Sequence, residues 1–146
     1  MSSKENIKIV QKLCACLCKN DPQQLHAFDE LISQNVQFHD PVMPNVTSGL
    51  QAFKQSEMNY IKAFPDKSAK VNLIFCAEDR VVVRWTATGT HKGPFQGIAP
   101  TNRSAKISGI TIYRIADNKI CEIWRSFDQL SLLEQLGVTR QQLAVR

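Results

Sequence analysis

The sequence predicts a single α+β domain, and two observations support this prediction. Apolar residues recur at helical spacing through much of residues 4–64, whereas alternating apolar residues dominate residues 71–128. Because the helices precede the strands rather than alternate with them, we expect helices packed on a curved antiparallel sheet. The 146 residues suit one domain, with a core of about residues 4–137 and a tail of residues 138–146.

Three helices are expected in the N-terminal part. The stretch from Lys4 to Lys19 has apolar residues three and four positions apart, which is typical of an amphipathic helix. Asp21 followed by Pro22 indicates the start of a second helix, whose apolar positions continue to Ile32. A third helix is expected over residues 48–63, from a Ser-Gly pair to the residues before a Pro-Asp pair.

Strands and turns follow. The strands are expected at residues 36–40, 71–77, 81–90, 105–116 and 119–128. A loop rich in glycine and proline over residues 91–103 separates two hairpins, and Asp117-Asn118 is typical of the turn in the second hairpin. In the first hairpin, Val71, Leu73 and Phe75 are expected to share one face. A short helix rich in leucine, ended by Gly137, closes the domain.

The second hairpin also predicts an interface. If Ala116 pairs with Lys119, Trp124 lies opposite Thr111, on the same face as Gly109. The other face would then carry Ile110, Ile112, Cys121, Ile123 and Phe127. A sheet that is apolar on both faces must be covered on both. Since the helices cover only one, we expect a homodimer through the outer face of the sheet.

Composition and charge exclude several classes of partner. The net charge is +5, but the basic side chains are spread along the chain, so nucleic-acid binding is not expected. The longest apolar run, Leu13–Cys18, is far shorter than the roughly 20 residues that cross a bilayer, and no secretory signal is recognisable. We therefore expect a cytoplasmic protein without membrane contact. Five cysteines without metal-ligand spacing are expected to be small buried hydrophobes.

Three titratable side chains next to strand ends are candidate catalytic residues: Asp40, His91 and Asp128. Each also has a structural interpretation, because Asp40 could brace its own turn, His91 its loop, and Asp128 could cap the closing helix. The expected pocket walls are His39, Met58, Tyr60, Trp85, Gly109 and Trp124. No nucleophilic triad, phosphate loop or metal-ligand cluster is recognisable, which favours chemistry without metal or cofactor.

Several strings together resemble a known family. They are Ser48-Gly49 with Ala52-Phe53, Thr90-His91 with Gly93, Gly97, Pro100, Thr101 and Arg103, Arg114-Ile115-x-Asp117-x-Lys119-Ile120, and Gln135-Leu136-Gly137. Their order and spacing are similar to those of the SnoaL-like polyketide (ester) cyclases, in the nuclear-transport-factor-two-like superfamily. The resemblance runs almost end to end. It implies a dimeric α+β cone with a small-molecule pocket between sheet and helices, and an intramolecular aldol reaction without cofactor.

The resemblance also implies where the reaction should occur. In the antibiotic cyclases a histidine lies three places before the Arg of the Arg-Ile string, and an acid/base aspartate lies eleven places after it. Those places hold Thr111 and Arg125 in this sequence, so both are expected in the pocket. Because arginine does not accept a proton near neutral pH, Asp40 or Asp128 would have to replace the missing carboxylate. An inward-pointing Arg125 would favour an anionic group on the ligand.

Three functions are therefore left open. The first is a cyclase-, isomerase- or lyase-type enzyme that acts on a small, largely apolar organic molecule by acid/base chemistry. The second is a non-catalytic ligand-binding or dimerisation module that has lost the acid/base pair. A third possibility is a partner-binding protein that uses the outer sheet, like the transport-factor members of the superfamily.

Overall fold

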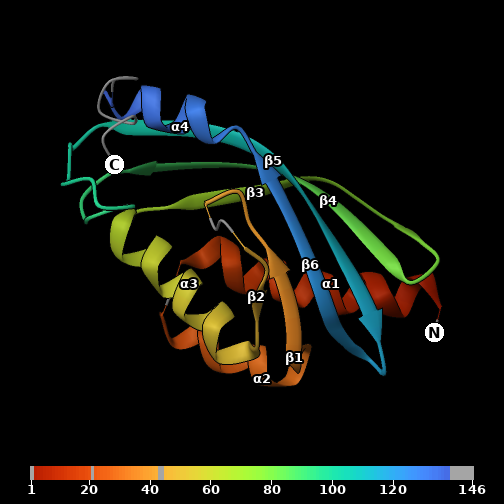
Figure 1. Ribbon diagram of the computed structural model, residues 1–146. Helices are drawn as coiled ribbons and strands as arrows, with labels where there is room; N and C mark the ends of the chain where they lie inside the picture. Colours follow the sequence, from red (N-terminus) through yellow and green to blue (C-terminus); the bar gives the residue numbers. More distant parts are fainter. Residues whose placement is uncertain (1, 21, 43–44, 139–146) are drawn as a thin grey trace.

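A curved sheet covered by helices on one face forms the domain (Figure 1). The computed structural model describes residues 2–20, 22–42 and 45–138, and all elements below lie within them. The helices are α1 (Ser3–Lys19), a 3₁₀ helix (Pro22–Ala27), α2 (Phe28–Leu31), α3 (Leu50–Ala63) and α4 (Gln129–Gln135). The strands are β1 (Ile32–His39), β2 (Thr47–Ser48), β3 (Ser68–Ala77), β4 (Arg80–Thr90), β5 (Ser104–Ala116) and β6 (Lys119–Phe127). The predicted α+β class is confirmed.

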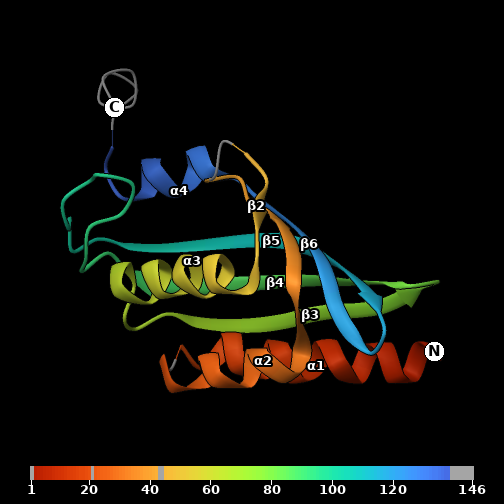
Figure 2. The same ribbon diagram turned by 60° about the horizontal axis from the view of Figure 1, so that its bottom comes forward.

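The six described strands form one sheet in the order β2-β1-β6-β5-β4-β3. It is a mixed sheet rather than a purely antiparallel one, because β1 runs parallel to β6. Figure 2 shows α1 and α2 in one row and α3 in a second row. Residues of α1 and α3, including Leu13 and Phe53, form the core with the sheet residues that face them. No helix among the described residues has the length and apolar character needed to cross a bilayer.

The second predicted helix is shorter than expected. Only one α-helical turn follows the 3₁₀ helix, and Ile32 begins β1, where it pairs with Ile120 of β6. The prediction that Ile32 lies in the helix was wrong because apolar residues a few positions apart suit a helix or a bulged strand, and pairing with β6 decides between them. Asp21, the expected N-cap, lies outside the described residues.

An extra residue in β3 changes which side chains face the core. Val71 pairs with Trp85 and Leu73 pairs with Arg84, so Asn72 is a bulge between them. Val71 and Ile74 therefore pack on the core, whereas Leu73 is 53% exposed on the outer face. The prediction that Val71 and Leu73 share a face was wrong for this reason.

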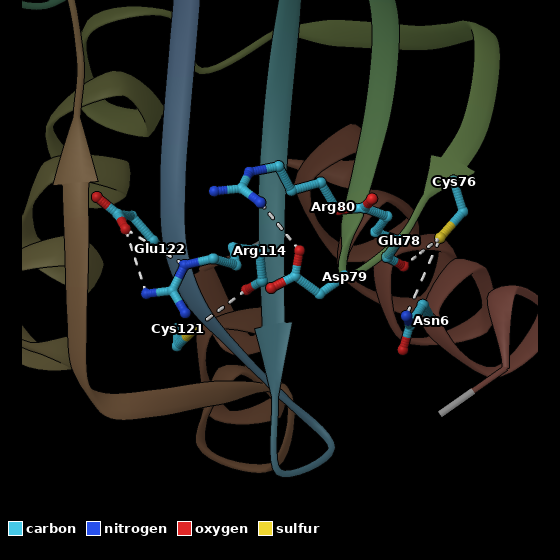
Figure 3. A network of polar contacts seen from close by, with 8 residues as sticks. All are labelled: Asn6, Cys76, Glu78, Asp79, Arg80, Arg114, Cys121 and Glu122. Atoms are coloured by element: carbon cyan, nitrogen blue, oxygen red, sulfur yellow. Dashed lines mark hydrogen bonds and ion pairs between the residues drawn. The ribbon is translucent and has the colours of Figure 1, made fainter.

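A second bulge, at Cys121 in β6, has a larger effect. The hairpin starts with Ala116 opposite Lys119, as predicted, but Arg114 then pairs with Glu122, and Cys121 donates its thiol hydrogen to the Arg114 carbonyl at 3.4 Å (Figure 3). Every later pair is displaced by one residue, so Arg125 rather than Trp124 lies opposite Thr111. A displacement of one residue exchanges the two faces of a strand. The predicted faces of this part of β6 were wrong accordingly.

Gly109 makes room for a side chain of the protein itself. A Cβ at this position would collide with the Trp85 ring and would lie 2.7 Å from the Ser126 carbonyl oxygen. Trp85 pairs with Gly109 across β4 and β5, and its Nε1–H donates to Thr111 Oγ1 at 2.9 Å. The indole is therefore fixed against the inner face of the sheet.

We expect Gly109→Ala to lower the free energy of unfolding by about 1–3 kcal/mol, because the added methyl group overpacks this contact. Chemical denaturation monitored by tryptophan fluorescence measures the change. Ser108→Ala, at an exposed neighbouring position, is the control and should change the stability much less. Equal stability of Gly109→Ala and the wild type would contradict the packing described for Trp85.

Candidate functional site

A cavity of about 110 Å³ lies between the inner face of the sheet and helices α1 and α3. Its lining is mostly apolar and consists of Cys14, Leu17, Cys18, Glu57, Tyr60, Lys67, Ala69, Val71, Val83, Trp85, Ala87, Ile107, Thr111, Tyr113, Arg125 and Phe127. An apolar protein cavity of about 150 Å³ is known to hold benzene, so this smaller cavity limits the apolar part of a ligand to about one ring. Tyr60, Trp85, Thr111 and Arg125 are the predicted pocket residues that line it.

Arg125 forms the polar end of this cavity. Its Nη1 donates to Asp40 Oδ2 at 3.1 Å, and its Nη2 donates to Glu57 Oε1 at 2.8 Å. The two carboxylate side chains are 0% and 4% exposed, so both ion pairs are shielded from water. Burial alone would lower the pKa of Arg125, but the carboxylates of Glu57 and Asp40 outweigh burial and raise it. Arg125 therefore remains charged and holds β6, the end of β1 and α3 together.

Asp40 lies outside the cavity lining and positions two residues that do line it. Besides Arg125, its carboxylate accepts hydrogen bonds from the Val42 N–H at 2.9 Å and from the Tyr60 hydroxyl at 3.1 Å. It braces its own turn, which is one of the two interpretations of the sequence, and it does not line the cavity. Burial and the Asp40 carboxylate raise the pKa of Tyr60 well above its usual value, so the phenol stays protonated. Asp40 is therefore a positioning residue for Arg125 and Tyr60.

Glu57 is the carboxylate that faces the cavity, and the sequence analysis missed it. It lies on α3, is 3% exposed and bonds to Arg125. A signal was present, because Glu57 falls four residues after Phe53 and four before Ile61, both on the apolar stripe of the predicted helix. A charged residue in such a stripe is rarely buried without a partner. The partner, Arg125, could not be identified from the sequence, because only the bulge in β6 places its side chain on the inner face of the sheet.

Two predicted pocket walls lie on the outer face of the sheet. Trp124 stacks on His39 with ring centroids 5.4 Å apart, and His39 Nε2 is 2.8 Å from Glu122 Oε2. Trp124 was expected inside because the Cys121 bulge was not anticipated, and His39 pairs with it across β1 and β6. Met58 and Gly109 also do not line the cavity.

The other two catalytic candidates take structural positions. His91 is fully buried, and its ring Nδ1 lies 3.1 Å from Thr101 Oγ1 within the loop that it opens. Burial lowers the pKa of His91, so the imidazole is neutral. Asp128 caps α4 by accepting a hydrogen bond from the Ser131 N–H at 2.9 Å. Neither residue lines the cavity, so a catalytic role for them stays a prediction without geometric support.

The Cys14 thiol and the Tyr113 phenol, which also line the cavity, are poor nucleophiles. Burial, together with the Cys18 thiol, raises the pKa of Cys14 to about 12, which keeps this thiol protonated. Burial likewise raises the pKa of Tyr113 far above its usual value. Within the part of the chain that the structure describes, no group of three His, Cys, Asp or Glu side chains could hold a metal ion.

We expect Arg125→Met to lower the free energy of unfolding by about 3–5 kcal/mol at pH 8, because two buried carboxylates lose their counter-charge. The loss should be smaller at pH 5, where protons can neutralise the carboxylates in the variant. Urea denaturation at both pH values measures this difference. Lys12→Met, at an exposed position of α1, is the control. A loss that is equal at the two pH values would contradict the proposed charge balance.

Solved structures share this fold over nearly the whole chain. A protein from Jannaschia sp. CCS1, provisionally described as a SnoaL-like polyketide cyclase, is 19% identical with a TM-score of 0.85, and the match covers 94% of each chain. AclR from Streptomyces galilaeus, provisionally described as a hydroxylase, is 27% identical with a TM-score of 0.79 and coverage of 93% and 98%. IdmH from Streptomyces antibioticus, provisionally described as a polyketide cyclase, is 27% identical with a TM-score of 0.73 and coverage of 91% and 99%.

A family model gives the same result from the sequence. The model of the SnoaL-like polyketide cyclases matches residues 8–136, which include every element from the middle of α1 to the end of α4. A comparison with curated protein sequences finds no match. The family match covers most of the chain and agrees with the fold of the structural neighbours. The chain therefore belongs to the SnoaL-like polyketide cyclase family.

Proposed function

We propose that the protein binds a small, largely apolar carbonyl compound in the cavity and transfers a proton at the carbon next to the carbonyl, without metal or cofactor. The observation that carries this proposal is the buried Glu57 carboxylate in a mostly apolar lining, held by Arg125. A carboxylate next to an apolar cavity can act as a general base toward a C–H group of a ligand bound there. Membership of a polyketide cyclase family supports the same class of reaction.

The proposed mechanism uses two side chains directly. Glu57 takes the proton from the carbon beside the carbonyl, and the electron pair of the C–H bond moves to form an enolate. The positive charge of Arg125, at the same end of the cavity, stabilises the negative charge that develops on the enolate oxygen. The enolate carbon then attacks a second carbonyl of the same molecule, and Glu57 returns its proton to the new alkoxide. Atoms and charge balance without a further reactant.

The positions of Arg125 and Glu57 support the assignment of Glu57 as the base. At the place where the antibiotic cyclases resembled by this sequence have an acid/base aspartate on the last long strand, this chain has Arg125. A cation at this place pairs with a carboxylate from α3 instead. The base is therefore proposed to act from the helix side of the cavity, on a substrate bound with its acidic C–H toward α3.

A non-catalytic binding protein is the second candidate. Thr111 and Arg125 at the two cyclase positions favour it, because neither accepts a proton near neutral pH. Binding without proton transfer would use the same cavity. The two candidates are distinguished by a reaction that needs only a base and an apolar site.

We expect the protein to accelerate the ring opening of 5-nitrobenzisoxazole, in which a base removes one proton, the N–O bond breaks, and a coloured cyanophenolate forms. Glu57→Gln should lower the rate at least about tenfold, because general bases contribute roughly 10²–10⁴-fold. Glu134→Gln, on exposed α4 surface, should keep the full rate. The absorbance of the phenolate measures the rate for the wild type and for both variants. An unchanged rate in Glu57→Gln would contradict Glu57 as the base, and binding without acceleration would favour the second candidate.

We also propose that the protein forms a homodimer through the outer face of the sheet. Leu73, Phe75 and Ile110 are 53%, 46% and 46% exposed there, on strands β3 and β5. Their paired positions show that they face away from the helices. Exposed apolar side chains grouped in this way are typical of a surface that a partner covers. A second copy of the sheet offers the same apolar surface and so complements it.

We expect light scattering to give about twice the chain mass of 16.5 kDa. Ile110→Asp should shift the protein to the monomer, because it places a charge within the proposed interface. Leu130→Asp, at a leucine that is 43% exposed on α4, should remain dimeric. A monomeric mass for the wild type at micromolar concentration would contradict the proposal.

A further inference from the structure

Lys67 occupies a turn between α3 and β3 that is held from two sides. The Asp66 carboxylate accepts hydrogen bonds from the N–H and the hydroxyl of Thr90, each at 2.7 Å. From the end of α1, Asn20 Nδ2 donates to the carbonyl oxygens of Phe64 at 2.9 Å and Pro65 at 3.1 Å. These bonds fix the backbone of the turn, so Lys67 is presented to the cavity by a rigid segment.

The Lys67 side chain lines the cavity together with Glu57 and Arg125. Burial lowers the pKa of Lys67; the Glu57 carboxylate opposes this shift, and the Arg125 guanidinium adds to it. Lys67 is half-buried, so its side chain is partly withdrawn from bulk solvent. Among the residues that the structure describes, no hydrogen bond or ion pair is found for Lys67 Nζ. A partly buried ammonium group without a close partner is energetically costly, since charged groups in proteins are usually paired when buried.

Arg125 and Lys67 differ in what they can offer a ligand. Arg125 already pairs with two buried carboxylates, Asp40 and Glu57, so a ligand carboxylate beside its remaining N–H groups would be repelled by both of them. A ligand carboxylate at Lys67 displaces no partner. The expectation that Arg125 binds an anionic group of the ligand is therefore replaced by one that assigns this role to Lys67.

We propose that Lys67 binds the carboxylate of an anionic ligand whose single apolar ring fills the cavity beside Trp85. This inference rests on the proposed function in one respect, namely that the ligand occupies this cavity. It adds the substrate class: a carbonyl compound that carries one apolar ring and one carboxylate, rather than a neutral carbonyl compound. A lysine ammonium provides a compact positive charge that suits such a group.

Titration calorimetry with phenylacetate and its neutral analogue phenylacetamide tests the proposal. The wild type should bind phenylacetate at least about tenfold more tightly, the range expected for a hydrogen bond to a charged group. Lys67→Met should remove this preference and leave the affinity for phenylacetamide within about twofold of wild type, because an apolar chain of similar length keeps the wall intact. Lys67→Arg should keep most of the preference. Lys70→Met, at an exposed lysine of β3, is the matched control and should behave as wild type.

The outcomes separate the two proposals. Equal affinities for the two compounds in the wild type, or an unchanged preference in Lys67→Met, would overturn the role of Lys67 while leaving the cavity as a binding site. If neither compound binds, both this inference and the proposed function fail. Retained affinity of Lys67→Met for phenylacetamide shows that the variant is folded.

A second readout follows from the lowered pKa of Lys67. A bound carboxylate stabilises the ammonium form, so phenylacetate binding should take up protons in the alkaline range below the usual lysine pKa of about 10.4, where a lysine of lowered pKa is partly deprotonated. The other titratable or charged groups that line the cavity are Glu57 and Tyr60 of α3, Cys14 and Cys18 of α1, Tyr113 of β5 and Arg125 of β6. Calorimetry in two buffers of different ionisation enthalpy measures the uptake. Its disappearance in Lys67→Met would support Lys67 as the group, and the same uptake in that variant would overturn the proposal.

Discussion

The ion pairs of Arg125 with Asp40 and Glu57 are the interaction on which the site depends. They join β6, the end of β1 and α3, and they place one cation between two carboxylates that water does not reach. Buried ion pairs often add little net stability compared with apolar side chains of similar volume. We therefore infer that these pairs serve geometry: they aim Glu57 at the cavity and keep Arg125 charged beside it. Tyr60, bonded to Asp40, completes the wall.

One extra residue in β6 makes this arrangement possible. Without the bulge at Cys121, Trp124 would face the helices and Arg125 would face away from them. With it, the arginine enters the core, and the tryptophan stacks on His39 at the outer face. The bulge at Asn72 acts in the same way on β3, where it brings Leu73 to the outer face. The two bulges thus place Arg125 on the inner face of the sheet, and Trp124 and Leu73 on the outer face.

The elements of the fold could be predicted from local patterns, because apolar spacing and turn residues report on the chain itself. The third helix, the Asp117-Asn118 turn and the Asp128 cap follow from this local information. The faces of the strands could not be predicted, since no local signal distinguishes a bulge at Cys121 from regular pairing. Glu57 had a signal, a charge in an apolar helical stripe. Lys67 had none, because its direction depends on hydrogen bonds that Asn20 and Thr90, from distant segments, donate to its turn.

The cavity combines an apolar lining with three charged groups, and this combination links the binding and the chemistry that we propose. Glu57 and Arg125 act on one part of a ligand, and Lys67 holds another. A crystal structure with bound phenylacetate tests this arrangement most directly. We expect the ring beside Trp85, the carboxylate within hydrogen-bond distance of Lys67 Nζ, and Arg125 still paired with Asp40 and Glu57. A ligand carboxylate bound to Arg125 in place of Glu57, or a ligand bound outside the cavity, would contradict it.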